Sequence, residues 1–212
     1  SGGLPPTDGF PLPQPREVPA PVAEAPSPAE PFDYAQILEQ FKGKDVTRVP
    51  VEEKLIALTF DGGGNAGAVD RIAQILSASS AEATFFLTQM FMEKFPDAVK
   101  AIAQEEWEIA NHTVTHRDLS LATEEETVAE VKGMEKYAKA QGVRLAPFFR
   151  FPYGEYKNGD IELVNDLGYV SVRWTVDSLG WQGLPAGRQG SVEGRSAQFV
   201  IGRVIEKAAP GA

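Results

Sequence analysis

Short apolar runs alternate with amphipathic stretches from residue 55 to the end of the chain, and this order constrains the fold more than any other feature. We expect strands at 55–60, 83–87, 108–110, 148–150 and 169–172, with a sixth near 173–176. We expect helices at 66–77, 97–105, 124–141, 161–167 and 198–208. Thr123 and Glu126 are spaced as a capping box before the longest helix, and Gly168 is placed to end the fourth. This order predicts an α/β protein with a parallel sheet, either an open doubly wound sheet or a barrel.

The N-terminal segment has a different composition from the rest. Residues 1–31 hold ten of the sixteen prolines, which favours an extended spacer over a ligand for a partner domain. Residues 32–41 have the apolar spacing of a short helix that docks on the main domain. We therefore divide the chain into a spacer with a docking helix at 1–50 and a main domain at 51–212. The Gly-rich, polar stretch at 185–196 is typical of a mobile loop.

Charge and composition exclude several functions. The formal net charge of −10 argues against a nucleic acid partner, which requires a basic surface, but it is compatible with a neutral glycan. The chain has no cysteine, so it forms no disulfide and performs no thiol chemistry. No apolar run approaches the ~20 residues that a membrane-spanning helix needs.

Both histidines of the chain lie four residues apart, at His112 and His116, directly after an expected strand. Asp61 follows another expected strand and precedes a run of glycines. Because the carboxyl ends of parallel strands meet at one edge of a sheet, these three side chains can converge on a divalent metal. The same residues also fit a solvated loop and an acidic helix cap, and spacing alone does not separate these interpretations.

Four motifs follow one another along the chain: Thr59-Phe60-Asp61-Gly62-Gly63, Asn111 to His116, Arg150-Phe151-Pro152-Tyr153-Gly154, and Trp174 to Trp181. In this order they resemble the polysaccharide deacetylase family, the NodB-like carbohydrate esterases. The resemblance covers about residues 51–212. It implies a distorted (β/α) barrel with seven strands.

The resemblance also implies roles for individual residues. Asp61 resembles the catalytic base and Arg150 the arginine that orients it, while Asp177 resembles an acid that tunes a catalytic histidine. Pro152, Tyr153 and Trp181 resemble substrate-binding residues, with the Tyr153 N–H as an oxyanion donor and Trp181 lining the acetyl pocket. The metal ligands would be His112 and His116, binding Zn²⁺ or alternatively Co²⁺, Ni²⁺ or Mn²⁺.

Two departures from the family pattern stand beside these matches. Gly62 replaces the second Asp of the first motif, which in the family completes the metal triad. We therefore expect weaker metal binding, or recruitment of Asn65 or Asp61, and tighter binding after Gly62→Asp. The Leu-x-His motif that supplies the catalytic acid is absent, so we expect a C-terminally truncated domain with little activity of its own.

These inferences predict a metal-dependent deacetylase that acts on an N-acetylated or O-acetylated polysaccharide, such as peptidoglycan or a chitin-like polymer. The alternative is a catalytically impaired, glycan-binding pseudoenzyme of the same fold. We expect the protein to be extracellular or at the cell surface, tethered by the N-terminal spacer.

Overall fold

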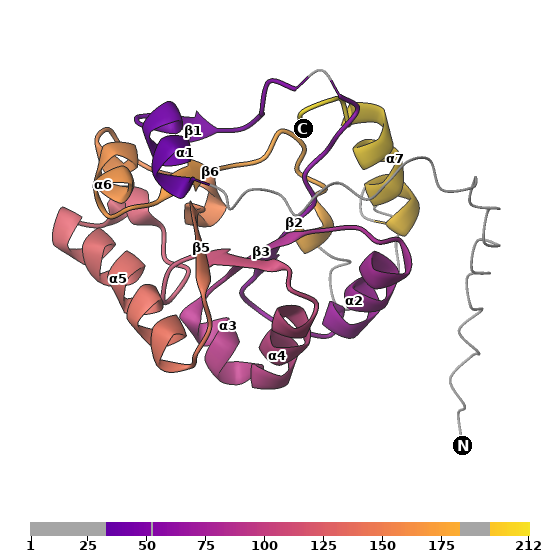
Figure 1. The fold of residues 1–212 in the computed structure, drawn as a ribbon, viewed down its shortest axis with the longest axis horizontal. Helices are drawn as coiled ribbons and strands as arrows, with labels where there is room; N and C mark the ends of the chain where they lie inside the picture. Colours follow the sequence, from indigo (N-terminus) through magenta and orange to yellow (C-terminus); the bar gives the residue numbers. More distant parts are fainter. Residues whose placement is uncertain (1–32, 52, 183–195) are drawn as a thin grey trace. The chain divides into compact units, whose positions relative to one another are not determined.

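Six parallel strands, curled into a half-barrel, form one sheet in the computed structural model, which describes residues 33–51, 53–182 and 196–212 (Figure 1). Their order across the sheet is β1-β6-β5-β4-β3-β2. The strands are β1 (Asp45–Val46), β2 (Thr59–Gly62), β3 (Thr84–Leu87), β4 (Glu108–Asn111), β5 (Leu145–Phe149) and β6 (Val170–Val172). The expected α/β class is therefore confirmed, and a curled parallel sheet brings the carboxyl ends of its strands to one edge.

Helices surround the outer side of this curved sheet within the unit Asp33–Ala212 (Figure 1). They are α1 (Tyr34–Phe41), α2 (Val69–Ala78), α3 (Gln89–Lys94), α4 (Pro96–Gln104), α5 (Glu124–Ala140), α6 (Asp160–Asp166) and α7 (Ala197–Lys207). None of the helices among the described residues is long and apolar enough to span a membrane.

The structure corrects three expectations about these elements. Residues 173–176 form a loop, and the sixth strand is instead β1, which pairs with β6. The apolar run before β2 is not a strand at 55–58; its backbone bonds the C-terminal turn, with Gly211 donating to Leu55 and Ala57 donating to Ala212. Helix α3 was not expected. These segments were difficult to predict because β1 and α3 are too short to show a period.

The local signals at helix ends are confirmed. The Thr123 side chain accepts from the Glu126 N–H, and the Glu126 side chain accepts from the Thr123 N–H, so α5 begins with a capping box. Gly168 follows α6 with a φ of 93°, which favours glycine. The expected docking helix is α1. The Gly43 N–H after it donates to Asn165 Oδ1 over 2.7 Å, which ties this turn to α6.

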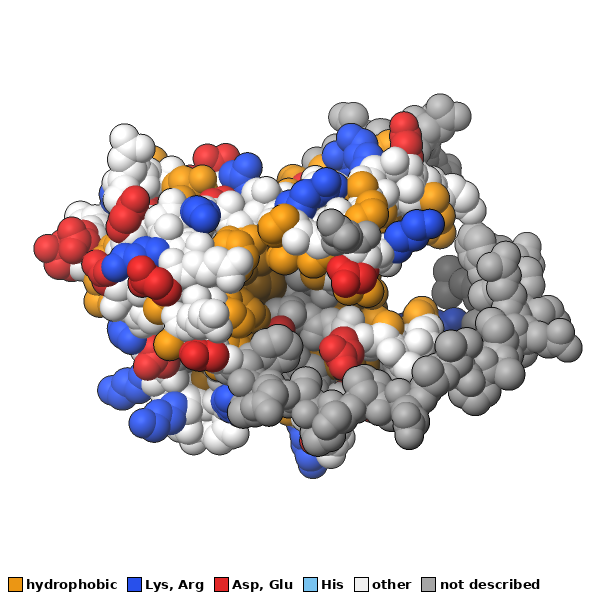
Figure 2. Space-filling view, turned by 45° about the horizontal axis from the view of Figure 1, so that its top comes forward, with side chains coloured by type: hydrophobic (Ala, Val, Ile, Leu, Met, Phe, Trp, Pro, Cys, Tyr) orange, Lys and Arg blue, Asp and Glu red, His pale blue; other side chains and the backbone are white. Residues whose placement is uncertain are grey.

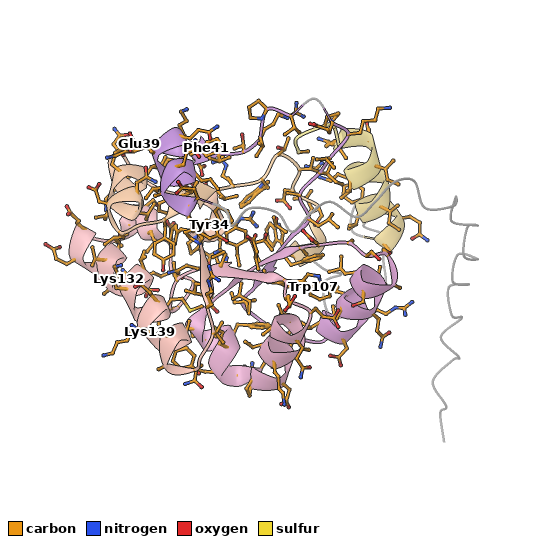
Figure 3. All side chains as sticks on the ribbon, in the orientation of Figure 1. Tyr34, Glu39, Phe41, Trp107, Lys132 and Lys139 are labelled. Carbon is orange, nitrogen blue, oxygen red and sulfur yellow. The ribbon has the colours of Figure 1, made fainter. Side chains whose placement is uncertain are left out.

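The core lies between the sheet and the outer helices. Phe60, Phe85 and Trp107 form a stack across the region of β2 to β4, with ring centroids 5.1 Å and 5.7 Å apart (Trp107 is labelled in Figure 3). The last three residues of β3 are all buried, because the strand is covered on both faces. Figure 2 shows hydrophobic side chains gathered around a hollow in the face turned toward the viewer.

Candidate active site

Three of the predicted site residues meet at the carboxyl ends of neighbouring strands. Asp61 lies within β2, His112 directly follows β4, and Arg150 directly follows β5. These residues are distant in sequence, and the parallel register of the sheet brings them together. Asp61 contacts Arg150 directly and lies 3.9 Å from His112, so the three side chains form one connected site.

Arg150 holds Asp61 through a buried guanidinium group. Its Nη1 donates to Asp61 Oδ1 over 2.5 Å, while Nε and Nη2 donate to the carbonyl oxygens of Val172 and Arg173 over 3.2 Å and 3.1 Å. The guanidinium carbon lies 3.9 Å from the Phe86 ring centroid, so the group is also stacked. Only 2% of Arg150 is exposed. Arg150 therefore fixes one oxygen of Asp61 and leaves the other, Oδ2, available.

His112 presents an unprotonated nitrogen to this carboxylate. Its Nδ1 lies 2.8 Å from the Arg150 carbonyl oxygen, which can only accept, so Nδ1 carries the proton. Its Nε2 is buried, has no hydrogen-bond partner among the described residues, and lies 3.9 Å from Asp61 Oδ2. Burial lowers the pKa of His112 from 6.5 to about 4, although the Asp61 charge opposes the shift. His112 is therefore neutral at pH 7, with a free lone pair at Nε2.

His116 lies beside His112 because the loop between them bends sharply. The two ring centroids are 4.8 Å apart, and the His116 N–H donates to Thr113 Oγ1 over 3.0 Å. Thr113 and His116 have φ angles of 76° and 61°, in the left-handed region that side chains rarely adopt. Burial lowers the pKa of His116 also, again opposed by Asp61. The loop thus places two neutral imidazoles together.

Two neutral imidazoles beside a carboxylate are suitable donors for a divalent metal, and the unpartnered Nε2 of His112 supports this fit. The expected third ligand is not supplied. Within the described ranges, no group of three or more His, Asp or Glu side chains is arranged to hold a metal. Of the two expected substitutes, Asn65 accepts instead from the Gly67 N–H of its own loop over 3.3 Å, and Asp61 is held at Oδ1 by Arg150. The fit is therefore to a two-histidine site.

Gly62 is restricted by its surroundings. A Cβ atom at this position would lie 2.5 Å from Leu87 Cδ2 and 3.3 Å from Phe91 Cδ2. A side chain at residue 62 would therefore displace Leu87, which is itself buried. The expectation that Gly62→Asp tightens metal binding stays a prediction, and it requires the end of the flexible Leu87 side chain to shift.

The remaining predicted residues border the site or lie beside each other on a loop. Tyr153 is 62% exposed, has a φ of 63°, and its ring centroid lies 4.7 Å from that of His116; its neighbour Pro152 is buried. Asp177 accepts from the Leu179 N–H and, over 3.4 Å, from Trp181 Nε1. Asp177 is thus brought together with Trp181, and these two hydrogen bonds hold the loop.

Sequence reasoning missed two residues that support the site. Arg203 in α7 donates to the Asp177 carbonyl oxygen over 2.6 Å, and nothing in the sequence pattern pointed to it. Glu130 in α5 accepts hydrogen bonds from the loop between the histidines. Glu130 could have been found, because it falls among the buried positions Thr127, Val131 and Met134 of α5, where an acidic residue is unusual.

The profile of the polysaccharide deacetylase family matches residues 48–172. A peptidoglycan-N-acetylglucosamine deacetylase of Bacillus cereus is 33% identical over 137 residues, which cover 65% of this chain and 50% of that protein. A chitooligosaccharide deacetylase of Azorhizobium caulinodans is 27% identical over 165 residues, covering 77% and 73%. This chain thus spans about half the length of the first of these relatives.

Solved structures share the fold. A peptidoglycan N-acetylglucosamine deacetylase in complex with a substituted benzamide is 29% identical, with a TM-score of 0.69, covering 78% of this chain and 72% of that one. A family 4 pseudoenzyme from Bacillus anthracis is 22% identical, with a TM-score of 0.72, covering 82% and 58%. At that identity the second likeness concerns the fold alone.

Proposed function

Because this chain belongs to the polysaccharide deacetylase family, we propose that it removes acetyl groups from an N-acetylated glycan at the Asp61, His112 and His116 site. The observation that carries the proposal is the arrangement around Asp61. One oxygen is held by Arg150 at 2.5 Å, and the other lies 3.9 Å from the neutral Nε2 of His112. This arrangement supports a base that is fixed in orientation and still accessible.

Asp61 acts as the general base in this proposal. Its Oδ2 takes a proton from a water molecule as that water attacks the acetyl carbonyl carbon. Because both histidines are assigned to the metal, the protonated Asp61 returns this proton to the departing amine as the C–N bond breaks, which releases acetate and the free amine; with no separate acid, we expect turnover to be slow. Arg150 keeps Oδ1 occupied, so the carboxylate presents Oδ2 rather than rotating. Asp61 is the more exposed partner of this ion pair, which leaves a route for water to reach it.

His112 and His116 bind a divalent ion in this proposal, with Zn²⁺ preferred over Co²⁺, Ni²⁺ or Mn²⁺. The family generally depends on a metal, and such an ion polarises the acetyl carbonyl and makes a nearby water more acidic. The His112 contact to the Arg150 carbonyl keeps the proton on Nδ1 and directs Nε2 into the site. Both imidazoles are neutral near pH 7, as metal ligands must be.

The exposed aromatic residues bind the sugar. Tyr153 and Trp181 are 62% and 76% exposed, and rings of this kind pack against the apolar faces of sugar units. The relatives named above are a peptidoglycan-N-acetylglucosamine deacetylase and a chitooligosaccharide deacetylase. We therefore propose an N-acetylglucosamine polymer as substrate, either peptidoglycan or chitin-like. We place the protein outside the cell or at its surface, tethered by residues 1–31.

A second candidate is a glycan-binding protein that lacks catalysis. The observation that favours it is Gly62, which contributes no side chain and faces Leu87 and Phe91. A metal held by two imidazoles binds more weakly than one held by three protein ligands. Such a protein would bind oligomers at the exposed rings of Tyr153 and Trp181 without releasing acetate.

Acetate release from N-acetylated chito-oligomers and from peptidoglycan fragments, measured with added Zn²⁺, tests both candidates. The first predicts release that is abolished in Asp61→Asn and retained in Asp70→Asn, a matched change of an exposed acid on α2. Oligomer binding in calorimetry without acetate release would favour the second candidate. Absence of both binding and release would refute both.

A further inference from the structure

The loop that carries the two histidines is bound by a carboxylate from outside the site. Glu130, in the second turn of α5, accepts from the N–H groups of Val114 and Thr115, both over 2.9 Å at Oε2. Its Oε1 accepts from the Thr115 hydroxyl group over 2.7 Å. Only 8% of Glu130 is exposed. One buried carboxylate thus receives three hydrogen bonds from the two residues at the centre of the His112–His116 loop.

This loop needs an external partner to keep its shape. Thr113 and His116 are held at φ angles of 76° and 61°, and a β-branched residue such as Thr113 is strained there. The N–H groups of Val114 and Thr115 point toward α5, where the Glu130 carboxylate is their acceptor. Without Glu130, both groups would lose their partner, and the loop would relax toward a less strained conformation.

Two further contacts show that α5 is fitted to this loop. Asn111 Nδ2 donates to the Val131 carbonyl oxygen over 3.0 Å, while Asn111 Oδ1 accepts from the Thr113 N–H. Gly133 allows the helix to approach, because a Cβ atom there would lie 2.7 Å from Val114 Cγ2. A glycine in the middle of a helix is destabilising, and this close approach to Val114 explains why a glycine is present at residue 133.

Glu130 faces the loop while the polar side of α5 faces elsewhere. Lys132 and Lys139, which are labelled in Figure 3, lie two turns apart on one side of α5. Glu130 precedes Lys132 by two residues, which places it about 200° around the helix. Glu130 therefore lies among the buried residues of α5 rather than with its solvated charges.

We propose that Glu130 is the positioning residue for the histidine pair, and that its hydrogen bonds to Val114 and Thr115 keep the His112 and His116 rings close enough to bind one metal. The role in catalysis rests on the proposed function, but the role in loop geometry does not. Glu130 acts through the loop backbone and contacts neither reacting atoms nor metal. The length and acceptor geometry of the Glu130 side chain, more than its charge, determine this role.

Variants of Glu130 separate geometry from charge. In Glu130→Gln, the amide oxygen still accepts from both N–H groups and the amide nitrogen meets Thr115 Oγ1, so the loop should keep its shape. Glu130→Asp keeps the charge but is one methylene shorter, and Glu130→Ala removes every acceptor. Glu135→Ala is the matched control, because Glu135 lies on the same helix and bonds Lys132 and Tyr169 instead.

The first measurement is made on the full chain without metal, by NMR. We expect Glu130→Ala and Glu130→Asp to lose the contact between the His112 and His116 rings and to speed hydrogen exchange at Val114 and Thr115. Glu130→Gln and Glu135→Ala should retain both signals. A wild-type ring contact in Glu130→Ala would overturn the proposal, and so would loss of that contact in Glu135→Ala.

The second measurement is calorimetric titration with Zn²⁺. Mutation of residues that support metal-binding histidines typically lowers metal affinity by about 10–100-fold. We expect a loss of Zn²⁺ affinity of that size in Glu130→Ala and near wild-type affinity in Glu130→Gln. An unchanged affinity in Glu130→Ala would overturn the proposal. If the wild-type chain bound no Zn²⁺, the proposed function would fail, and the ring contact measured without metal would still decide the role of Glu130.

Discussion

Acidification should destabilise the protein through His112 in particular. His112 is buried and neutral, and its pKa lies at about 4 in the folded protein, against 6.5 when solvated. Between these two values the unfolded chain binds a proton that the folded chain does not, so the free energy of unfolding falls as pH falls. This contribution is fully present above pH 6.5 and is lost by about pH 4. The difference between the two pKa values corresponds to about 3 kcal/mol.

Urea unfolding in metal-free buffer, repeated across this pH range, measures the effect. The control is His112→Gln, whose side-chain amide can still donate to the Arg150 carbonyl oxygen but does not titrate. Carboxylates distant from the site titrate alike in both proteins, so their contributions cancel in the difference between the two curves. We expect the wild type to lose about 3 kcal/mol more than His112→Gln on going from pH 7 to pH 4. Parallel curves would refute a buried, neutral His112.

Three further changes test the residues around the site. Arg150→Lys should lower the free energy of unfolding in urea by about 2–3 kcal/mol and abolish acetate release. A lysine cannot reproduce the planar contacts to Asp61 and to two carbonyl oxygens. An unfolding free energy equal to that of the wild type would contradict this reasoning. Gly62→Asp should lower the thermal midpoint of unfolding, and adding Leu87→Val should restore it and tighten Zn²⁺ binding. Tighter Zn²⁺ binding in Gly62→Asp alone would show that Leu87 does not obstruct a side chain at residue 62. Thr123→Ala should cost about 1 kcal/mol by removing the cap of α5, and an unchanged free energy of unfolding would contradict the capping box.

The regular part of the fold could be predicted because its signals are local. The capping box at Thr123 and the glycine after α6 specify helix ends through backbone hydrogen bonds and a positive φ, which the sequence reveals directly. The buried strand β3 and helix α5 also show clear patterns. Strand β1 could not be predicted, because its two residues are strand only through pairing with β6, which is distant in sequence.

The site could be predicted as a set of residues but not as a geometry. Asp61 and His112 stood out by type and by position after apolar runs, Arg150 was indicated by the resemblance of its motif, and the structure brings the three together. The support of the site could not be predicted in the same way. Glu130 and Arg203 act through contacts that depend on how α5 and α7 pack, and Gly62 is limited by Leu87 through space. Such contacts arise only from the tertiary fold.

Calorimetric titration of the full chain with Zn²⁺, compared with His116→Ala, tests the central claim most directly. His116 is half-buried, so its truncation should leave the fold intact, which circular dichroism can verify. We predict that the wild type binds one Zn²⁺ ion per chain and that His116→Ala loses at least about ten-fold in affinity, since it retains only one imidazole. Identical titrations of the two proteins would contradict the claim that the histidine pair forms a metal site.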